Sequence, residues 1–139
     1  MNFYIASSFN NSDMVRKLSQ ALELEGQKQL YDWTQNNRAH TMELLASIGK
    51  QEKEAVSNSD FFILILPGGK GSHTEFGIAL ALHKRIYIYS STNDLYDFDK
   101  TTTFYHLDHV NKFVGTFEAF TEYIIKQEIK SKTTISSKI

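Results

Sequence analysis

The chain of 139 residues is short enough to form one domain, and its 41% hydrophobic residues can supply a core without disulfides or a structural metal. Fifteen Lys and Arg residues against sixteen Asp and Glu residues leave a formal charge of -1, which argues against a nucleic-acid partner. The absence of cysteine excludes thiolate nucleophiles and cysteine-ligated metal centres, and no apolar run or basic leader indicates a membrane span or a signal peptide, so we expect a cytoplasmic protein without a membrane partner.

The first predicted unit is a strand followed by a helix. Residues 3–6 are continuously apolar, and the polar run over 7–11 indicates a loop after the strand. Apolar residues recur at helical spacing from Val15 to Leu22, and Gly26 stands where a left-handed residue would end the helix. We therefore expect a β-α unit over the first 26 residues.

The second predicted unit is weaker at its strand. Residues 29–33 form a candidate strand, and the polar composition of 34–40 predicts an exposed loop. A helix is expected to begin near Thr41 and to end around Asn58. Its apolar residues at helical spacing predict a stripe that packs on the sheet: Met42, Leu45, Ile48, Ala55 and Val56.

The clearest strand covers residues 61–66, which are apolar throughout, as in a central parallel strand covered on both faces. Pro67 ends it, because proline cannot extend a strand ladder. Gly68, Gly69 and Gly71 predict a flexible loop, and the next predicted elements are a helix over 76–83 and a fourth strand over 85–90.

The last third of the chain begins with a polar connection over 91–103. Residues 104–107 and 112–114 are candidate short extended pieces. Thr116 is a candidate cap for a final helix, whose core-facing residues are expected to be Phe117, Phe120, Ile124 and Ile125. We expect a domain over 1–130 and a flexible tail over 131–139, where apolar periodicity is lost.

This alternation of strands and helices predicts an α/β fold. Parallel strands need crossover helices, and right-handed crossovers place helices on both faces of the sheet. We expect a single flavodoxin-like (Rossmann-like) domain with a parallel sheet of about five strands. Ligands of such sheets bind at the carboxyl edge, which is expected to carry four segments: Ser7-Ser8, Asp32-Trp33, the loop from Gly68 to Glu75, and Ser90-Ser91.

The segment from Gly68 to Glu75 is the first candidate for chemistry. Its glycines and the following helix start could bind an anion through backbone N–H groups, although it is not a Walker motif. Glu75 has a structural alternative. Ser72, His73, Thr74 and Glu75 fit a capping box, and spacing alone favours that role for the glutamate.

Three other groups of residues allow more than one interpretation. Glu52 lies on the stripe expected to face the sheet, so it lies either at the solvated rim or in a polar cleft. Phe9, Tyr31 and Trp33 either stack on a planar ring or form the edge of the core. His106 and His109 lack a third ligand at suitable spacing, so we predict no metal site.

Three segments together resemble the nucleoside 2-deoxyribosyltransferases and the related nucleotide N-glycosidases. They cover residues 3–9, 52–60 and 66–81, in that family's order and approximate spacing, and Lys84 follows them. The third segment, which reads LPGGKGSHTEFGIALA, is the most specific. The resemblance implies an enzyme that cleaves the N-glycosidic bond of a (deoxy)nucleoside or nucleoside 5′-monophosphate, as a hydrolase or as a base-exchange transferase.

The resemblance also implies roles for particular residues. Glu75 corresponds to the family's nucleophile, Glu52 to an acidic residue that orients the base or sugar, and Ser8 to a serine at the 5′ end. Gly69 replaces an aspartate that many deoxyribosyltransferases use for the 5′-hydroxyl, which favours a 5′-phosphate beside Lys70. The expected substrate-binding residues are Ser8, Phe9, Asp32, Trp33, Gly69, Lys70, Gly71 and Ser72.

The same resemblance implies a homodimer or higher homo-oligomer, because the family often completes its site with a neighbouring subunit's residue from the region of Ser90 and Ser91. No cofactor is implied. Asp32, Glu52 or water could protonate the departing base, and His73 is a less favoured candidate. Two other functions stay open: a TIR-like domain that cleaves NAD, and a nucleotide-binding sensor without turnover.

Overall fold

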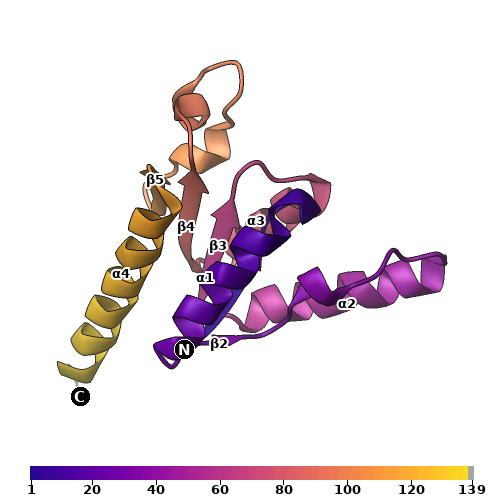
Figure 1. The fold of residues 1–139 in the computed structure, drawn as a ribbon, viewed down its shortest axis with the longest axis horizontal. Helices are drawn as coiled ribbons and strands as arrows, with labels where there is room; N and C mark the ends of the chain where they lie inside the picture. The colour runs from indigo at the N-terminus through magenta and orange to yellow at the C-terminus, as the bar shows by residue number, and fades with distance from the viewer. Residues whose placement is uncertain (138–139) are drawn as a thin grey trace.

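The fold is a five-stranded parallel sheet with helices on both faces (Figure 1). A computed structural model of the chain describes the backbone of residues 1–137 and the side chains of residues 1–129. The strand order is β2-β1-β3-β4-β5, which confirms the predicted flavodoxin-like α/β domain. The strands are β1 (Asn2–Ala6), β2 (Lys28–Gln29), β3 (Phe61–Ile65), β4 (Arg85–Ser90) and β5 (Val110–Val114).

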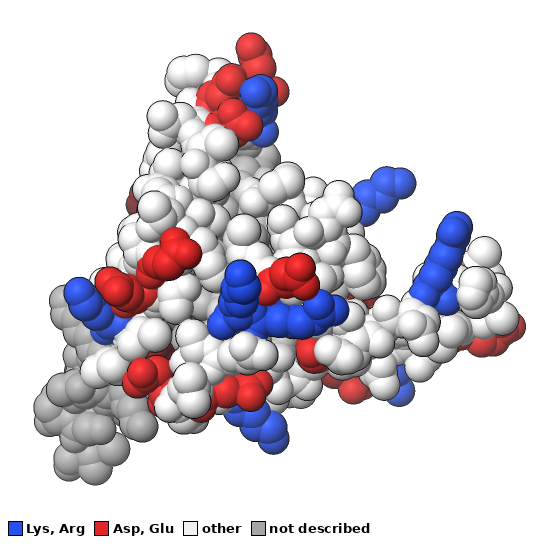
Figure 2. Space-filling view, viewed as in Figure 1, with Lys and Arg blue, Asp and Glu red and all other residues white. Residues whose placement is uncertain are grey.

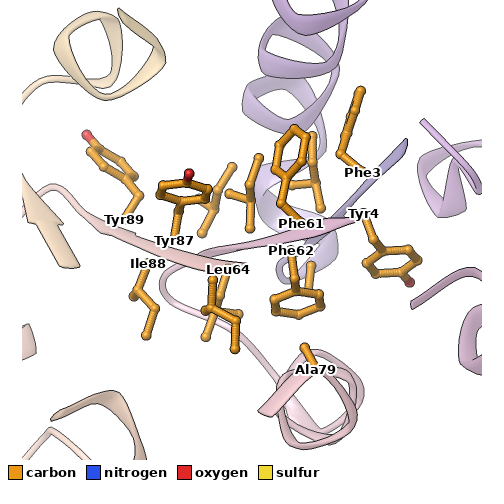
Figure 3. Close-up of a cluster of buried hydrophobic side chains, with 14 of the residues drawn as sticks. Phe3, Tyr4, Phe61, Phe62, Leu64, Ala79, Tyr87, Ile88 and Tyr89 are labelled. Carbon is orange, nitrogen blue, oxygen red and sulfur yellow. The ribbon is translucent and has the colours of Figure 1, made fainter. Parts of the chain in front are cut away.

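Alternating side chains of the central strands pack against two layers of helices (Figure 3). Tyr4, Phe62 and Leu64 point to the side where Ala79 of α3 lies, and Phe3, Phe61 and Tyr87 point to the other side. Helices α2 and α3 pack together, as do α1 and α4. The four helices are α1 (Ser12–Leu24), α2 (Met42–Asn58), α3 (Lys70–Ala81) and α4 (Phe117–Ser137).

The second strand is shorter than the predicted strand over 29–33. It pairs with β1 only through Lys28 and Gln29. Trp33 lies instead in a 3₁₀ turn, Trp33–Gln35, because the Asp32 carboxylate accepts a hydrogen bond from the backbone N–H of Thr34. A side chain that caps the next residues favours a turn over a strand.

Helix α2 has the predicted bounds, but its predicted core stripe is wrong for the first half of the helix. The Thr41 side chain caps the helix by accepting from the N–H of Leu44. Met42 is 79% exposed and Leu45 is 52% exposed, whereas Ala55 and Val56 are buried. The amino half of α2 projects away from the sheet (Figure 1), so those apolar residues lie beyond the edge of the sheet.

Helix α3 begins six residues before the predicted start. Gly69 is its N-cap and Gly71 is its second residue, so the predicted glycine loop is shorter than expected. The early start gives α3 the first-turn residues Lys70, Gly71 and Ser72, which were expected to lie in a loop. The amino end of α3 therefore lies directly after the short link from β3.

The connection after β4 contains two 3₁₀ turns, Asn93–Tyr96 and Thr103–His106, and the extended piece predicted over 104–107 is therefore wrong. Thr116 caps α4 as expected, since its hydroxyl accepts from the N–H of Ala119. Helix α4 continues to Ser137. The predicted tail over 131–139 includes residues 138 and 139, which lie outside the described residues.

Candidate active site

The candidate site is built around the hydroxyl of Tyr4, in the middle of β1. This hydroxyl donates a short hydrogen bond to Oε2 of Glu75 on α3, and it lies 3.4 Å from Oε2 of Glu52 on α2. Tyr4 and Glu75 are buried, and Glu52 is half-buried. Two acidic side chains from different helices thus meet at one phenol.

Burial changes the ionisation of this cluster. Burial raises the pKa of Glu75 to about 8, the Tyr4 hydrogen bond opposes this rise, and the neighbouring Glu52 carboxylate adds to it. Burial and the two carboxylates also raise the pKa of Tyr4, which stays a hydrogen-bond donor. The Glu75 carboxyl therefore loses its proton close to neutral pH, as acids and bases at catalytic sites commonly do.

The capping-box alternative for Glu75 is wrong. Because α3 begins at Lys70 after the N-cap Gly69, the third helical residue is Ser72 and not Glu75. The hydroxyl of Ser72 accepts from the N–H of Gly69 at 2.6 Å. The carboxylate of Glu75 instead faces β1, where the Tyr4 hydroxyl is its partner.

Tyr4 is the member of this cluster to which the sequence analysis assigned no role. It lies inside an apolar strand, where a tyrosine is normally a core residue. A buried phenol, however, usually has a hydrogen-bond partner. That rule is the signal in the sequence that could have singled out Tyr4.

The link between β3 and α3 is tightly packed at Gly68. A Cβ atom on Gly68 would lie 2.5 Å from Oγ of Ser72 and 3.2 Å from the ring of His73, so only glycine fits there. Lys70 and Gly71 are exposed at the start of α3. The N–H groups of a first helical turn have no acceptor within the helix, so this exposed end can receive an anion.

The first loop is joined to the same link. Asn11 donates from Nδ2 to the carbonyl of Pro67 at 3.2 Å and to the hydroxyl of Ser7 at 2.8 Å. The Ser7 hydroxyl in turn donates to the carbonyl of Ile65 at 2.8 Å. Half-buried Ser8 is next to Ser7, so this predicted 5′-end residue lies on a loop that is hydrogen-bonded to the β3-α3 link.

The predicted residues after β2 are engaged in their own turn. Asp32 accepts from the N–H and the hydroxyl of Thr34. The indole N–H of Trp33 donates to the carbonyl of Ile5 at 2.6 Å, and Trp33 is buried. Phe9 packs edge-on against Trp33 and is 62% exposed, so of these three residues Phe9 presents the free surface to a planar ligand.

A cavity of about 1020 Å³ lies on the other side of α3. His73, Phe76, Gly77 and Leu80 line it from α3, and the segment 91–107 lines it with residues such as Leu95 and Tyr105. At 3.6 residues per turn, His73, Gly77 and Leu80 point roughly opposite to Glu75. The cavity is therefore separate from the Tyr4 cluster, and His73 faces away from Glu75.

Surface charge is mixed on the face drawn in Figure 2. Lys and Arg side chains are interspersed with Asp and Glu, and acidic side chains gather where the segment 91–107 lies. No helix in the described part of the chain is both long and apolar enough to span a bilayer. Self-association stays a prediction.

Comparisons with known proteins give a fold relationship. No protein-family model matches the sequence, and no curated protein sequence matches it significantly. The fold is similar to that of the CMP N-glycosidase BcmB from Clostridium botulinum, with a TM-score of 0.60 and 16% identity over 89% of this chain and 98% of that one. It is also similar to a conserved protein from Enterococcus faecalis V583, with a TM-score of 0.63 and 15% identity over 92% of this chain and 98% of that one.

Proposed function

We propose that this protein is an enzyme that cleaves the N-glycosidic bond of a nucleoside 5′-monophosphate, with Glu75 as the nucleophile. The observation that carries the proposal is the buried Glu75 carboxyl, held by the Tyr4 hydroxyl and flanked by Glu52. The similarity in fold to a CMP N-glycosidase agrees with this proposal.

The chemistry requires a carboxylate beside the anomeric carbon. Cleavage develops positive charge at C1′, and an ionised Glu75 would capture that carbon while the bonding electron pair leaves with the base nitrogen. With Oε2 held by Tyr4, Oε1 is the oxygen available for attack. The base takes a proton from a water molecule that hydrogen-bonds to the Glu52 carboxylate, and the resulting hydroxide, or a second base, then attacks C1′ and releases Glu75.

Asp32 and His73 are less well placed than Glu52 to assist protonation of the departing base. The Asp32 carboxylate is engaged by the Thr34 N–H and hydroxyl. His73 points toward the large cavity and away from Glu75. Glu52 shares a hydrogen-bonding partner with Glu75, so it is the side chain we assign to the base.

The proposal is tested by incubating the protein with nucleosides, their 5′-monophosphates and NAD, and by chromatography for free base. Release of base from a 5′-monophosphate supports the proposal. Release of nicotinamide from NAD alone would favour the TIR-like alternative. Thermal stabilisation by a nucleotide without free base would indicate a sensor.

We expect a preference for the 5′-monophosphate over the free nucleoside. Gly69 places no carboxylate near the substrate's 5′ end, and Lys70 and the exposed amino end of α3 can attract a phosphate. One charge-assisted hydrogen bond, about 1.5–3 kcal/mol, corresponds to a preference of roughly tenfold or more in kcat/KM.

Lys70→Ala is expected to reduce this preference while leaving kcat/KM for the free nucleoside unchanged. Lys53→Ala, at an exposed lysine of α2, is the matched control and should leave the preference intact. If the wild-type kcat/KM for the free nucleoside equalled or exceeded that for the 5′-monophosphate, the assignment of a phosphate site would be contradicted.

The pH dependence of kcat/KM tests the coupling between the two glutamates. Because Glu75 must be ionised to attack and its pKa is about 8, wild-type kcat/KM should rise with pH until about pH 8. Glu52→Gln removes a charge that raises the pKa of Glu75, so the rise should occur at lower pH. Loss of the carboxylate that positions the proton-donating water should also lower kcat about 10²-fold.

Glu54→Gln is the control for this experiment, since Glu54 is an exposed carboxylate two positions along α2. It should change neither kcat nor the pH profile. If Glu52→Gln left the profile of kcat/KM at the wild-type position, the two carboxylates would not be coupled in the free enzyme.

A further inference from the structure

A hydrogen-bonded chain joins the amino end of α3 to the segment 91–107, which follows β4 (Figure 1). Nδ1 of His73 lies 2.9 Å from the carbonyl oxygen of Gly69, and Nε2 lies 2.6 Å from the hydroxyl of Tyr105. A carbonyl only accepts, so Nδ1 carries the proton toward Gly69. In the neutral ring, Nε2 then accepts from the Tyr105 hydroxyl.

In the described part of the molecule, this is the only side-chain hydrogen bond that joins the segment 91–107 to α3. The other described side-chain hydrogen bonds of the segment 91–107 stay within the segment or go to β4. Tyr105 is itself fixed, because it is buried and its ring packs on Phe76, with 5.8 Å between the two ring centroids. A rigid side chain is therefore the anchor for His73.

His73 in turn contacts the turn that connects β3 to α3. The carbonyl of Gly69 also accepts from the His73 N–H at 3.1 Å, and a Cβ atom on Gly68 would lie 3.2 Å from the His73 ring. On the opposite side, Asn11 holds the carbonyl of Pro67. The turn that connects β3 to α3 is thus held from the first loop by Asn11 and from the segment 91–107 by Tyr105.

We infer that Tyr105, acting through His73, is a positioning residue that holds the turn over 67–70 in its binding geometry. This inference rests on the proposed function in one respect, namely that the turn receives the 5′ end of the substrate. Glu75 faces the other side of α3 and keeps its Tyr4 partner, so the pair acts on substrate binding rather than on the chemical step.

Three substitutions separate this role from simple packing. Tyr105→Phe keeps the ring on Phe76 and removes the hydroxyl. His73→Asn places an amide near the position of Nδ1, so it keeps the bond to Gly69 and loses the bond to Tyr105. His73→Gln reaches the position of Nε2, so it keeps an acceptor for Tyr105 and loses the bond from Nδ1 to Gly69.

For the 5′-monophosphate that releases most base, Tyr105→Phe and His73→Asn should each raise KM about 2- to 10-fold, the range expected for one hydrogen bond, with little change in kcat. The double variant should be no worse than either single variant, because both remove the same bond. His73→Gln should show a loss of similar size, because its link from Nδ1 to Gly69 is broken. Tyr96→Phe, at an exposed tyrosine of the same segment, is the control.

Amide hydrogen exchange tests the positioning without any assay of activity. In Tyr105→Phe, the amides of residues 68–73 should exchange about 2- to 10-fold faster than in the wild type, and those of β1 should be unchanged. If the wild type released no base, the proposed function would fail, and exchange would still decide the positioning. Unchanged exchange over 68–73, or additive effects in the double variant, would overturn the inference.

Discussion

Glu75→Gln is expected to abolish base release while the protein stays folded. The amide retains the shape of the side chain and can still accept from Tyr4, but it cannot supply the negative charge that captures C1′. Loss of a catalytic nucleophile costs about 10⁴-fold or more in kcat. The measurement is free base by chromatography, with circular dichroism to verify the fold.

The same substitution should stabilise the protein at alkaline pH. The pKa of Glu75 is raised from 4.5 in the unfolded chain to about 8 in the fold, so the folded state binds more protons between these values. Wild-type stability therefore falls as the pH rises through this window. Glu75→Gln lacks this penalty, and its Tm should exceed that of the wild type more at pH 8 than at pH 5.

Glu43→Gln, at an exposed glutamate in the first turn of α2, is the control for both measurements. It should alter neither the release of base nor the difference in Tm between the two pH values. Base release by folded Glu75→Gln within tenfold of the wild-type rate would remove Glu75 from the role of nucleophile.

Tyr4→Phe is the second substitution with a large expected effect. Its hydroxyl lowers the pKa of Glu75 against the effect of burial and fixes one carboxylate oxygen. Removing it should raise the pKa of Glu75 further and release the side chain from its attacking orientation. A hydrogen bond to a charged group corresponds to about 10- to 100-fold in kcat/KM at neutral pH.

The pH profile separates the two contributions of Tyr4. The rise of kcat/KM should move above pH 8 in Tyr4→Phe, and activity should recover in part at high pH, where Glu75 becomes ionised. Tyr31→Phe, at a half-buried tyrosine outside the cluster, should leave the profile in place. A profile of Tyr4→Phe that coincided with the wild type would show that the hydroxyl does not act on Glu75.

Glu75 itself illustrates the limit of local sequence patterns. Ser72 and Glu75 have the spacing of a capping box, yet the helix begins at Lys70, so that spacing has no capping role. The start of α3 was hard to predict because Gly69, Lys70 and Gly71 have a loop-like composition, whereas the Ser72 hydroxyl caps the helix by accepting from the N–H of Gly69. Helix boundaries depend on such contacts more than on composition.

The sequence by itself determined the order of strands and helices and the parallel sheet. Runs such as 61–65 and 86–89 are continuously apolar and separated by helical periodicity, so few other folds can bury them. The tertiary structure alone decided which side chains meet. Tyr4 contacts Glu75 across 71 positions of the chain and Glu52 across 48, and no local pattern encodes a contact that forms only when β1, α2 and α3 pack together.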